Sequence, residues 1–521
     1  MPVHPAIESR RDLWKIIFAS SAGTLIEWYD FYIFASLATV VSAKFFPDDD
    51  GLLAFLKTLA VVWIGFAVRP FGAVIFGYLG DVIGRKHTFL VTLLLMGGAT
   101  FAIGILPTYA TAGAFAPVAL LILRLMQGLA LGGEYGGAAT YIAEHAPDGQ
   151  RGFWTSWIQT TATLGLFVSL GVILACRLSM SAESFSEWGW RIPFLLSIAL
   201  VVFSYILRSR MKESPVFQRM KASGKGSRNP IRDSFANRAN LKFVLLALFG
   251  AAAGQGVVWY TGQFYALFFL QRTVKVELVQ SNIIIGAALL IATPLFILTG
   301  WLSDRIGRKP IMLTGCALAA ATYIPIFMGI MAQGDLSRKI EAAVAVTGST
   351  APPAQRTLTV PDALLPAAAG ETVTIETVRR VYTDGTTAIE TRTTAAGGAS
   401  RAEFSDVRLG TRPLLLTLGL IVVLVAYVAM VYGPIAAFLV ELFPTRIRYT
   451  SMSLPYHIGN GVFGGLVPFA STWLAAYVSQ RHPGHWFNPY AGLAYPIAIA
   501  ALTVLIGGIF IRENRHARID V

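Results

Sequence analysis

Five charged residues interrupt long apolar stretches in the first third of the chain: Glu27, Asp30, Arg69, Arg124 and Glu134. A charge at the centre of a bilayer costs about 2.5–3.5 kcal/mol on insertion scales, so such side chains pair with one another or face water. A buried carboxyl can hold a proton and release it when its surroundings change, and an arginine can bind an anionic group. These residue types therefore predict proton transfer and ligand binding inside a membrane.

Glu27 and Asp30 are three residues apart, so on a helix they share one face. Arg69 lies at a similar depth in the next apolar segment, which makes Glu27 and Arg69 the natural pair. That pairing keeps Glu27 ionised and leaves Asp30 as the better proton site, because a buried carboxyl without a counter-charge favours its protonated form. Arg124 can then favour release of the proton when the halves of the chain rearrange. A purely structural ion pair is the alternative interpretation.

Gln127 and Glu134 follow Arg124 on one apolar segment. At 100° per residue the three side chains lie within about 80° of arc. Arg124 is far from the predicted membrane surface, so we predict that it binds an anionic group or tunes a carboxylate. Glu134 is a third candidate for the proton site.

A polar stripe also runs along the apolar segment 240–271. Gln255, Trp259 and Gln263 recur there every four residues, beside Tyr260. The segment 450–478 adds three more polar residues: Tyr456, His457 and Asn460. We predict that these side chains line a cavity. Hydrogen bonds between helices are an equal alternative for the amides and the indole, and a packing histidine is favoured over a proton carrier at His457.

A short charged motif occurs twice in the chain. Each copy closes one apolar segment and opens the next, and the two copies are Gly77-x-x-x-Asp81-x-x-Gly84-Arg85-Lys86 and Gly300-x-x-x-Asp304-x-x-Gly307-Arg308-Lys309. A second pair of motifs repeats as well, Glu144-x-x-Pro-x-x-x-Arg151 and Glu441-x-x-Pro-x-x-x-Arg448. Matching motifs in matching places indicate a duplicated membrane architecture.

We predict that these loops form two equivalent gates at the cytoplasmic face. Asp81 can face the N-terminus of a neighbouring helix, where the helix dipole favours an anion by about 0.3–1 kcal/mol. Arg85 and Arg151 are expected to flank Glu144. Arg308 and Arg448 are expected to flank Glu441 in the same way. The alternative interpretation is that these basic residues serve only to orient the chain in the membrane.

The composition excludes an ordinary soluble domain, because 55% of the 521 residues are hydrophobic and only 14% are charged. An apolar run of roughly 20 residues can span a bilayer as a helix. Twelve such segments are predicted, at about 13–41, 52–80, 88–108, 115–144, 152–178, 190–209, 240–271, 278–303, 310–332, 412–441, 450–478 and 489–511. No cleavable signal peptide is expected, because the first apolar run is too long.

The net charge of +13 comes from Lys and Arg residues that gather in alternate loops, including a basic run from Arg208 to Lys242. This is the positive-inside pattern, and it places both termini and both repeated motifs in the cytoplasm. The basic excess therefore indicates orientation and contact with membrane lipid, and a nucleic-acid partner is not expected.

The predicted halves are residues 1–210 and, together, residues 240–333 and 412–521, joined by a cytoplasmic linker at 211–239. The spacing between Lys309 and Glu441 exceeds that of the first half, so residues 334–411 are predicted to be an extracytoplasmic insertion. Alternating residues on both sides of Asp384-Gly385 indicate a β-hairpin within it. We expect the insertion to be peripheral to the transport path.

The repeated loops resemble the signature of the major facilitator superfamily. Several other stretches resemble its metabolite:proton symporter branch, which includes α-ketoglutarate, shikimate, citrate and proline/betaine permeases: Glu27-Trp-Tyr-Asp-Phe31, Arg69-Pro-Phe-Gly72, Arg124-x-x-Gln-Gly128, Gly132-Gly-Glu134, Trp188-Gly-Trp-Arg-Ile-Pro193 and Glu213-Ser-Pro215. The resemblance spans nearly the whole chain except the insertion. It implies an all-α membrane protein of twelve transmembrane helices in two pseudo-symmetric halves.

The function implied is proton-coupled uptake of a small polar metabolite, an organic acid or a zwitterion, by alternating access. Efflux by proton antiport is an alternative, and a membrane-embedded receptor is a second one. The motifs that mark common enzyme active sites and metal sites are absent from the sequence, so an enzyme is not expected. We expect a monomer in the bacterial inner membrane, with no cofactor and with the proton gradient as the driving force.

Overall fold

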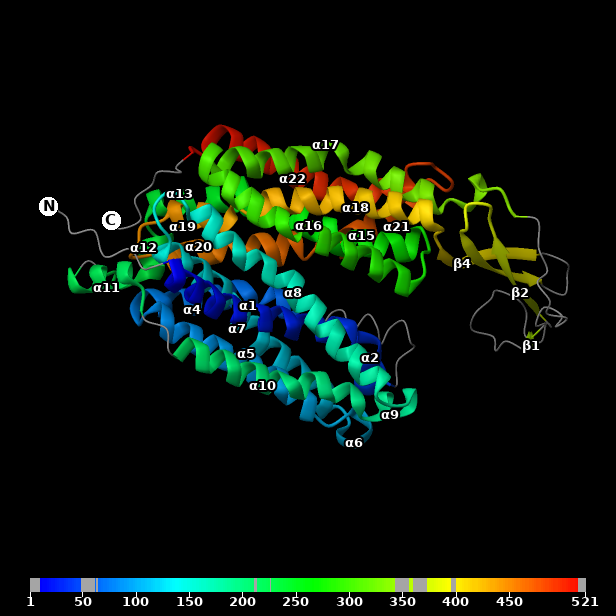
Figure 1. Cartoon of the computed structure of the whole chain (residues 1–521), viewed down its shortest axis with the longest axis horizontal. Helices are drawn as coiled ribbons and strands as arrows, with labels where there is room; N and C mark the ends of the chain where they lie inside the picture. The colour runs from blue at the N-terminus through cyan, green and yellow to red at the C-terminus, as the bar shows by residue number, and fades with distance from the viewer. Residues whose placement is uncertain are drawn as a thin grey trace.

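The computed structural model describes residues 10–47, 61, 64–209, 213–224, 226–342, 356–358, 373–394 and 400–513. Part of the predicted apolar segment 52–80 and parts of the predicted insertion lie outside these residues. Within the described part, ten helical stretches are long and apolar enough to cross a membrane. The helices run roughly along the long axis of the molecule, in two groups that lie side by side (Figure 1).

The first half consists of helices that follow the predicted apolar segments closely. Its elements are α1 (Arg10–Ser36), α2 (Ala38–Phe45), α4 (Arg69–Val82), α5 (Arg85–Ile105), α6 (Tyr109–Ala112), α7 (Phe115–His145), α8 (Arg151–Leu178), α9 (Ala182–Glu187), η1 (Gly189–Arg191) and α10 (Ile192–Ser209). Two short helices follow in the predicted linker, α11 (Pro215–Ala222) and α12 (Pro230–Phe235). Ser214 caps α11 by accepting a hydrogen bond from the Phe217 amide.

The second half begins with a long helix in which α and π turns alternate: α13 (Arg238–Ala247), η2 (Leu248–Ala252), α14 (Ala253–Tyr260), η3 (Thr261–Tyr265), α15 (Ala266–Phe268) and η4 (Phe269–Thr273). Inserted π turns are rare and occur often at functional sites. The remaining helices are α16 (Leu278–Ile306), α17 (Arg308–Gly334), η5 (Leu336–Arg338), α18 (Thr411–Tyr432), α19 (Ile435–Leu442), α20 (Arg448–His457), η6 (Ile458–Gly464), α21 (Val467–Arg481), η7 (Asn488–Leu493) and α22 (Ala494–Phe510).

The segment between α17 and α18 contains a four-stranded antiparallel sheet with the order β1 (Arg356–Leu358), β2 (Val373–Val381), β3 (Thr387–Thr394) and β4 (Ser400–Arg408). The strands β2 and β3 pair across a turn in which Gly385 has a φ of 80°. The sheet is larger than the single hairpin expected from the alternation, because β1 and β4 add one strand at each edge.

The sheet is attached to the helical domain through β4 and the loop before α16. The backbone amide of Glu277 donates to the carbonyl of Val407, and the amide of Val407 donates to the carbonyl of Lys275, each at 2.9 Å. Gln280 extends this contact by bonding both the amide and the carbonyl of Leu409. The sheet lies at the opposite end of the molecule from α11 and α12 (Figure 1).

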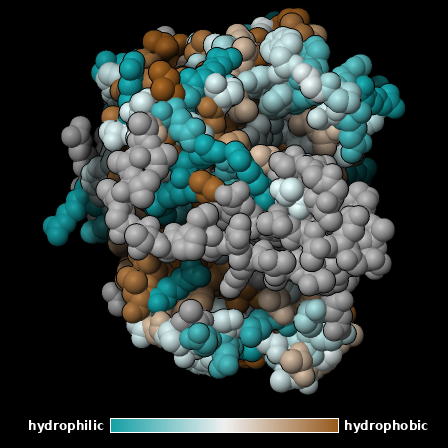
Figure 2. Space-filling view, turned by 90° about the vertical axis from the view of Figure 1, so that its right-hand side faces the viewer, coloured by the Kyte–Doolittle hydropathy of each residue, from teal (hydrophilic) through white to brown (hydrophobic). Residues whose placement is uncertain are grey.

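The two halves meet along two pairs of helices related by the repeat, because α8 packs against α16 and α4 packs against α20. Large apolar side chains cover the outside of the bundle, and several are at least half exposed, including Phe71, Leu94, Leu174, Leu290 and Leu505. Figure 2 shows the end that carries the sheet, where hydrophilic residues gather between patches of hydrophobic ones. An apolar belt with polar ends suits a bilayer.

Candidate functional site

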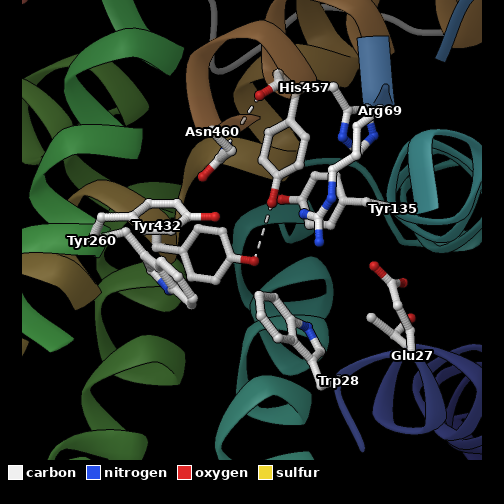
Figure 3. A pocket seen from close by; sticks show the side chains of 11 residues that line it. Glu27, Trp28, Arg69, Tyr135, Tyr260, Tyr432, His457 and Asn460 are labelled. Atoms are coloured by element: carbon white, nitrogen blue, oxygen red, sulfur yellow. Dashed lines mark hydrogen bonds between the residues drawn. The ribbon is translucent and has the colours of Figure 1, made fainter. Parts of the chain in front are cut away.

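A small cavity lies between the two halves and is lined by both. Its lining residues are Thr24, Glu27, Trp28, Arg69, Tyr135, Trp259, Tyr260, Tyr432, Tyr456, His457 and Asn460. Figure 3 shows eight of these side chains converging from helices of both halves. The cavity volume is ≈ 20 Å³, which is room for about one water molecule. The structure is therefore a form in which the walls have closed together.

Each half supplies its lining residues by helical spacing. In the first half, Thr24, Glu27 and Trp28 occupy one face of α1, Arg69 begins α4 and Tyr135 lies on α7. In the second half, the lining side chains come from α14, α18, α20 and η6. Thr24, Trp28, Tyr135 and Tyr432 were not among the predicted site residues. Trp28 and Tyr135 directly follow the predicted acids Glu27 and Glu134, and that adjacency was the available signal.

Aromatic contacts join the halves on both sides of the cavity. Tyr135 of the first half stacks on Tyr456 of the second with ring centroids 3.8 Å apart. Within the second half, the hydroxyl groups of Tyr432 and Tyr456 are 3.1 Å apart. Trp28 of the first half contacts Trp259 of the second, with centroids 5.3 Å apart. The closed cavity is thus held mainly by aromatic side chains, which can separate without leaving unpaired charges.

The predicted amide stripe divides between two roles. Gln255 exchanges two hydrogen bonds with Asn460, at 3.1 and 2.8 Å, so it joins α14 to η6 and does not line the cavity. Gln263 is buried one turn beyond Trp259 and also lies outside the cavity lining. The prediction that both glutamines line the cavity is therefore wrong in this form of the molecule, and interhelical bonding accounts for Gln255.

Glu27 and Arg69 line the same cavity but do not form the predicted ion pair. Among the described residues, no ion pair within 4.0 Å joins them, and the Oε2 atom of Glu27 and the Nε atom of Arg69 have no hydrogen-bond partner. Arg69 instead places its guanidinium 4.2 Å from the ring centroid of Phe66. The two opposite charges therefore face the cavity separately.

Glu134 has a partner that the sequence analysis assigned to a cytoplasmic basic run. Arg208 at the end of α10 is 1% exposed, and it donates two hydrogen bonds to the Glu134 carboxylate, one of them 3.1 Å long. Thr92 donates a third, at 3.0 Å. Arg208 still belongs to α10 and also donates to the carbonyls of Phe89 on α5 and Ser20 on α1, so it points inward to Glu134 and is not a loop residue. Glu134 is consequently a paired acid and a weak candidate for the proton site.

Asp30 belongs to a separate chain of hydrogen bonds outside the central cavity. Thr100 donates to Oδ2 of Asp30 at 2.8 Å, and Gln127 donates to the Thr100 hydroxyl at 2.6 Å. Arg124 donates to Oε1 of Gln127 at 2.8 Å and lies 4.2 Å from the ring centroid of Phe34. Asp30 is fully buried, and its Oδ1 atom has no partner among the described residues. Two polar side chains therefore link this carboxyl to the arginine.

The first copy of the repeated loop forms a buried cluster, which we call the first charge network: Asp81, Arg85, Glu144 and Arg448. Asp81 lies at the N-terminus of α20, where it accepts hydrogen bonds from the backbone amides of Tyr449 at 3.3 Å and Thr450 at 2.9 Å. Arg85 lies 3.1 Å from Asp81 and 3.6 Å from Glu144. Arg448 completes the network with a 2.9 Å contact to Glu144.

The second charge network contains Asp304, Arg308, Glu441 and Arg151. Asp304 lies at the N-terminus of α8 and accepts from the amides of Gly152 at 2.8 Å and Phe153 at 2.7 Å. Arg308 lies 2.7 Å from Asp304 and donates two hydrogen bonds to the Glu441 carboxylate, at 3.0 and 3.2 Å. Arg151 approaches Glu441 at 3.6 Å.

The two networks correct one predicted arrangement. Arg151 was expected beside Glu144, and Arg448 beside Glu441, but the structure exchanges these two arginines between the halves. The reason is packing, because α20 lies against α4 and α7 of the first half, whereas α8 lies against α16 and α19 of the second. The arginine that begins each of these helices is therefore carried across to the acid of the other half.

Glycines in the repeated motif make these contacts possible. Gly84 and Gly307 have φ values of 134° and 108°, which L-residues rarely adopt, and each begins the helix that carries the network arginine. Gly77 and Gly300 let their helices approach α20 and α8 closely. Lys86 and Lys309 continue the motif, and the latter donates to the carbonyls of Gly508 and Ile511.

No group of three or more His, Cys, Asp or Glu side chains that could hold a metal ion occurs within the described ranges. Cys176 and Cys316 are free and buried.

A family model described as "Sugar (and other) transporter" matches residues 15–350. The proline/betaine transporter of Salmonella typhimurium is 34% identical over 324 residues, which cover 61% of this chain and 64% of that protein. The inner membrane metabolite transport protein YhjE of Escherichia coli is 29% identical over 511 residues, covering 96% of this chain and 94% of the relative.

A structure of the proton:xylose symporter XylE superimposes with a TM-score of 0.64 over 98% of both chains, at 17% sequence identity. That likeness shows the fold. The family match, over more than half of the chain, shows that it belongs to the sugar (and other) transporter family, with the fold of the major facilitator superfamily.

Proposed function

We propose that this chain is a proton-coupled symporter that imports a small polar metabolite, an organic acid or a zwitterion, by alternating access. The observation that carries the proposal is the closed cavity between the two halves, which presents unpaired polar groups to its interior. A transporter of this class needs a central site and two separate closures, one toward each side of the membrane.

Two different closures flank the cavity. Toward the end that carries α2 and the sheet, the halves meet through rings, since Phe264 contacts both Tyr32 and Phe31, with centroids 6.4 and 6.2 Å apart. At the opposite end they meet through the two charge networks. Opening the rings exposes the cavity on one side, and breaking the networks exposes it on the other.

The proposed topology has twelve transmembrane helices in the bacterial inner membrane, with both termini in the cytoplasm. The halves are residues 1–210 and, together, 240–333 and 412–521, and the protein acts as a monomer without a cofactor. The alternation of basic loops supports this orientation. It puts the charge networks on the cytoplasmic side and the insertion at 334–411 outside the cell, since the sheet lies at the far end of the molecule (Figure 1).

Labelling of single cysteines in intact cells tests this topology. Thr386 is fully buried, so the exposed Thr383 in the neighbouring turn is the better position. Thr383→Cys should react with a membrane-impermeant maleimide added outside the cell, whereas Lys86→Cys should react only after the membrane is opened. Reaction of Thr383→Cys from the cytoplasmic side alone would overturn the orientation.

Asp30 is the proposed proton carrier. It is fully buried, one of its oxygens has no partner among the described residues, and hydrogen bonds through Thr100 and Gln127 link it to Arg124. A movement of the halves that shortens this link would favour the ionised form, and a movement that lengthens it would favour the protonated form. Such a carboxyl can take up a proton on one side and release it on the other.

Transport by purified protein in liposomes tests this proposal. Uptake against a gradient should require an imposed pH gradient, acid outside, while exchange of internal for external substrate should not. Asp30→Asn should abolish the accumulation and spare the exchange, and Thr100→Val should have a weaker effect. Accumulation by Asp30→Asn would exclude Asp30 as the carrier, and accumulation that opposes the proton flow would indicate antiport.

A further inference from the structure

The central cavity contains one positive and one negative side chain, and among the described residues no ion pair within 4.0 Å joins them. Arg69 is 6% exposed and Glu27 is 8% exposed, and among the described residues they are the only Asp, Glu, Lys or Arg in the cavity lining. Buried charges without a direct partner are costly. Binding of a ligand that carries one negative and one positive group, and so pairs with both side chains, would be strongly favoured.

Two other buried arginines of the first half are engaged outside the cavity lining. Arg208 is hydrogen-bonded to Glu134, and Arg124 is hydrogen-bonded to Gln127 beside the ring of Phe34. The cavity therefore has a single cationic group for an anionic substrate. A ligand with two carboxylates would place its second negative charge in a space whose only other charge is the carboxylate of Glu27.

Aromatic faces make up most of the remaining wall. Trp28 and Tyr135 come from the first half, and Trp259, Tyr260 and Tyr432 come from the second, with Trp259 and Tyr260 rings 4.9 Å apart. The electron-rich faces of such rings attract cationic nitrogen, by about 2 kcal/mol or more when the site is desolvated. The indole nitrogen of Trp259 has no partner among the described residues, so it is also available as a donor.

We propose that the substrate is a small zwitterion, and this inference rests on the transport function proposed above. Its carboxylate binds Arg69, with the Trp259 indole N–H as a second donor. Its cationic nitrogen lies against the tyrosine and tryptophan rings and is balanced by Glu27. The aromatic contacts between the halves must separate for the ligand to enter, because the closed cavity holds about one water molecule.

Binding of matched ligands to the purified full-length protein tests the cationic requirement. Glycine betaine and 3,3-dimethylbutanoate have the same shape, but the second has carbon in place of the quaternary nitrogen. Glycine betaine or L-proline should bind at least about tenfold more tightly than 3,3-dimethylbutanoate, with 2-oxoglutarate weaker still. Equal binding of the two isosteres, tighter binding of 2-oxoglutarate, or no binding of any zwitterion would overturn the proposal.

Two variants distinguish binding from a structural role. Glu27→Gln should weaken glycine betaine at least about tenfold and leave 3,3-dimethylbutanoate unchanged, whereas Arg69→Gln should weaken both. Glu183→Gln, outside the cavity, is the matched control and should weaken neither. Loss of both ligands in Glu27→Gln would overturn the assigned role of Glu27. Proton-driven accumulation of 2-oxoglutarate without any zwitterion would refute this inference while keeping the transport function, and accumulation of no compound would refute that function.

Discussion

The two charge networks contain the same residue types but divide their contacts differently. In the first network Glu144 has its short contact, 2.9 Å, with Arg448 of the other half, and Arg85 of its own half is 3.6 Å away. In the second network Glu441 has its short contacts, 3.0 and 3.2 Å, with Arg308 of its own half. The crossing residue Arg151 is the distant one there, at 3.6 Å.

This difference indicates that the two networks contribute unequally to holding the two halves together. At its glutamate, the first network resists separation of the halves through an arginine of the other half, whereas the glutamate of the second network is held mainly within its own half. At the aspartates both networks join the halves, because Asp81 and Asp304 each accept hydrogen bonds from backbone amides of the other half. Burial adds to the inequality, because Arg151 also contacts Asp148, whose side chain is 77% exposed. An exposed ion pair contributes little. At its glutamate, the first network is therefore the stronger link between the halves on the proposed cytoplasmic side.

The largest effect is expected from Arg448→Gln. Removing one partner of a buried ion pair costs about 3–5 kcal/mol, because the other charge stays buried. Part of that cost should appear as opening of the cytoplasmic side. A cysteine at Thr24, which lines the cavity, should react about tenfold faster with a thiol reagent added from the cytoplasmic side.

That measurement uses inside-out vesicles and a background in which Cys176 and Cys316 are replaced by alanine. Retained substrate exchange shows that Arg448→Gln still folds, and Arg448→Lys should recover part of the closure. An unchanged labelling rate in a folded Arg448→Gln protein would show that the first network does not close the cavity.

A smaller effect is expected from Arg151→Gln, about 1–2 kcal/mol, since its contact with Glu441 is longer and Arg308 still holds that carboxylate. The same labelling assay, run on Arg151→Gln and Arg448→Gln side by side, compares the labelling rates of the cavity cysteine. Their ratio shows how much each network contributes to the closure. Faster labelling in Arg151→Gln than in Arg448→Gln would reverse the ranking.

Local patterns in the sequence predict much of this architecture, and contacts between distant segments explain the rest. The repeated motifs identify which residues form the charge networks, because their types and spacing are local. Pairing across the halves is not local, so Arg151 and Arg448 were assigned to the wrong acids. Arg208 was missed for a related reason: its place at the end of an apolar segment resembles a loop position, and only the path of α10 brings it to Glu134.

In the central cavity, too, local sequence patterns do not predict the contacts between distant segments. Spacing on single helices finds Glu27, Arg69 and Trp259, but opposite charges at similar depth suggested a pair where the structure has two separate charges. Tyr432 carries no local signal, since it is one aromatic residue near the end of a long apolar helix. Its position in the cavity depends on the packing of α18 against α14.

A third, smaller effect is expected from the two aspartates. Asp81 accepts three hydrogen bonds from the start of α20, including one from the Thr450 hydroxyl, and Asp304 accepts two from the start of α8. A carboxylate at a helix N-terminus contributes about 0.3–2 kcal/mol. Arg85 would lose its 3.1 Å contact with Asp81 but would keep Glu144 as a counter-charge, so the added cost is limited. Asp81→Asn should therefore speed labelling of the Thr24→Cys cavity site about two- to fivefold, and Asp304→Asn should speed it less. Unchanged accessibility in Asp81→Asn would remove it from the gate.

The smallest effect on transport is expected in the sheet, which has no counterpart in the first half. Its buried Glu390 is held by Arg380 and Arg392, each at 2.6 Å. Burial alone would raise the pKa of this carboxyl, but hydrogen bonds from Arg392 and Arg380 hold the pKa of Glu390 below its usual range. In the unfolded chain a glutamate has a pKa of about 4.3. The stabilisation is therefore fully present above that pH and is lost as the pH falls through the folded-state pKa.

Hydrogen-exchange protection of β2 and β3, corrected for intrinsic exchange rates, should consequently weaken at pH values below about 4.3. Glu390→Gln should lower the protection at neutral pH and flatten its dependence on pH. Glu403→Gln removes an exposed pair with Lys275 and should keep the dependence of the unmodified protein. Both variants should transport normally at neutral pH, because none of the cavity-lining residues belongs to the described part of the sheet. A transport defect confined to Glu390→Gln would instead show that the sheet, through its contact with the loop before α16, takes part in the movement of the second half.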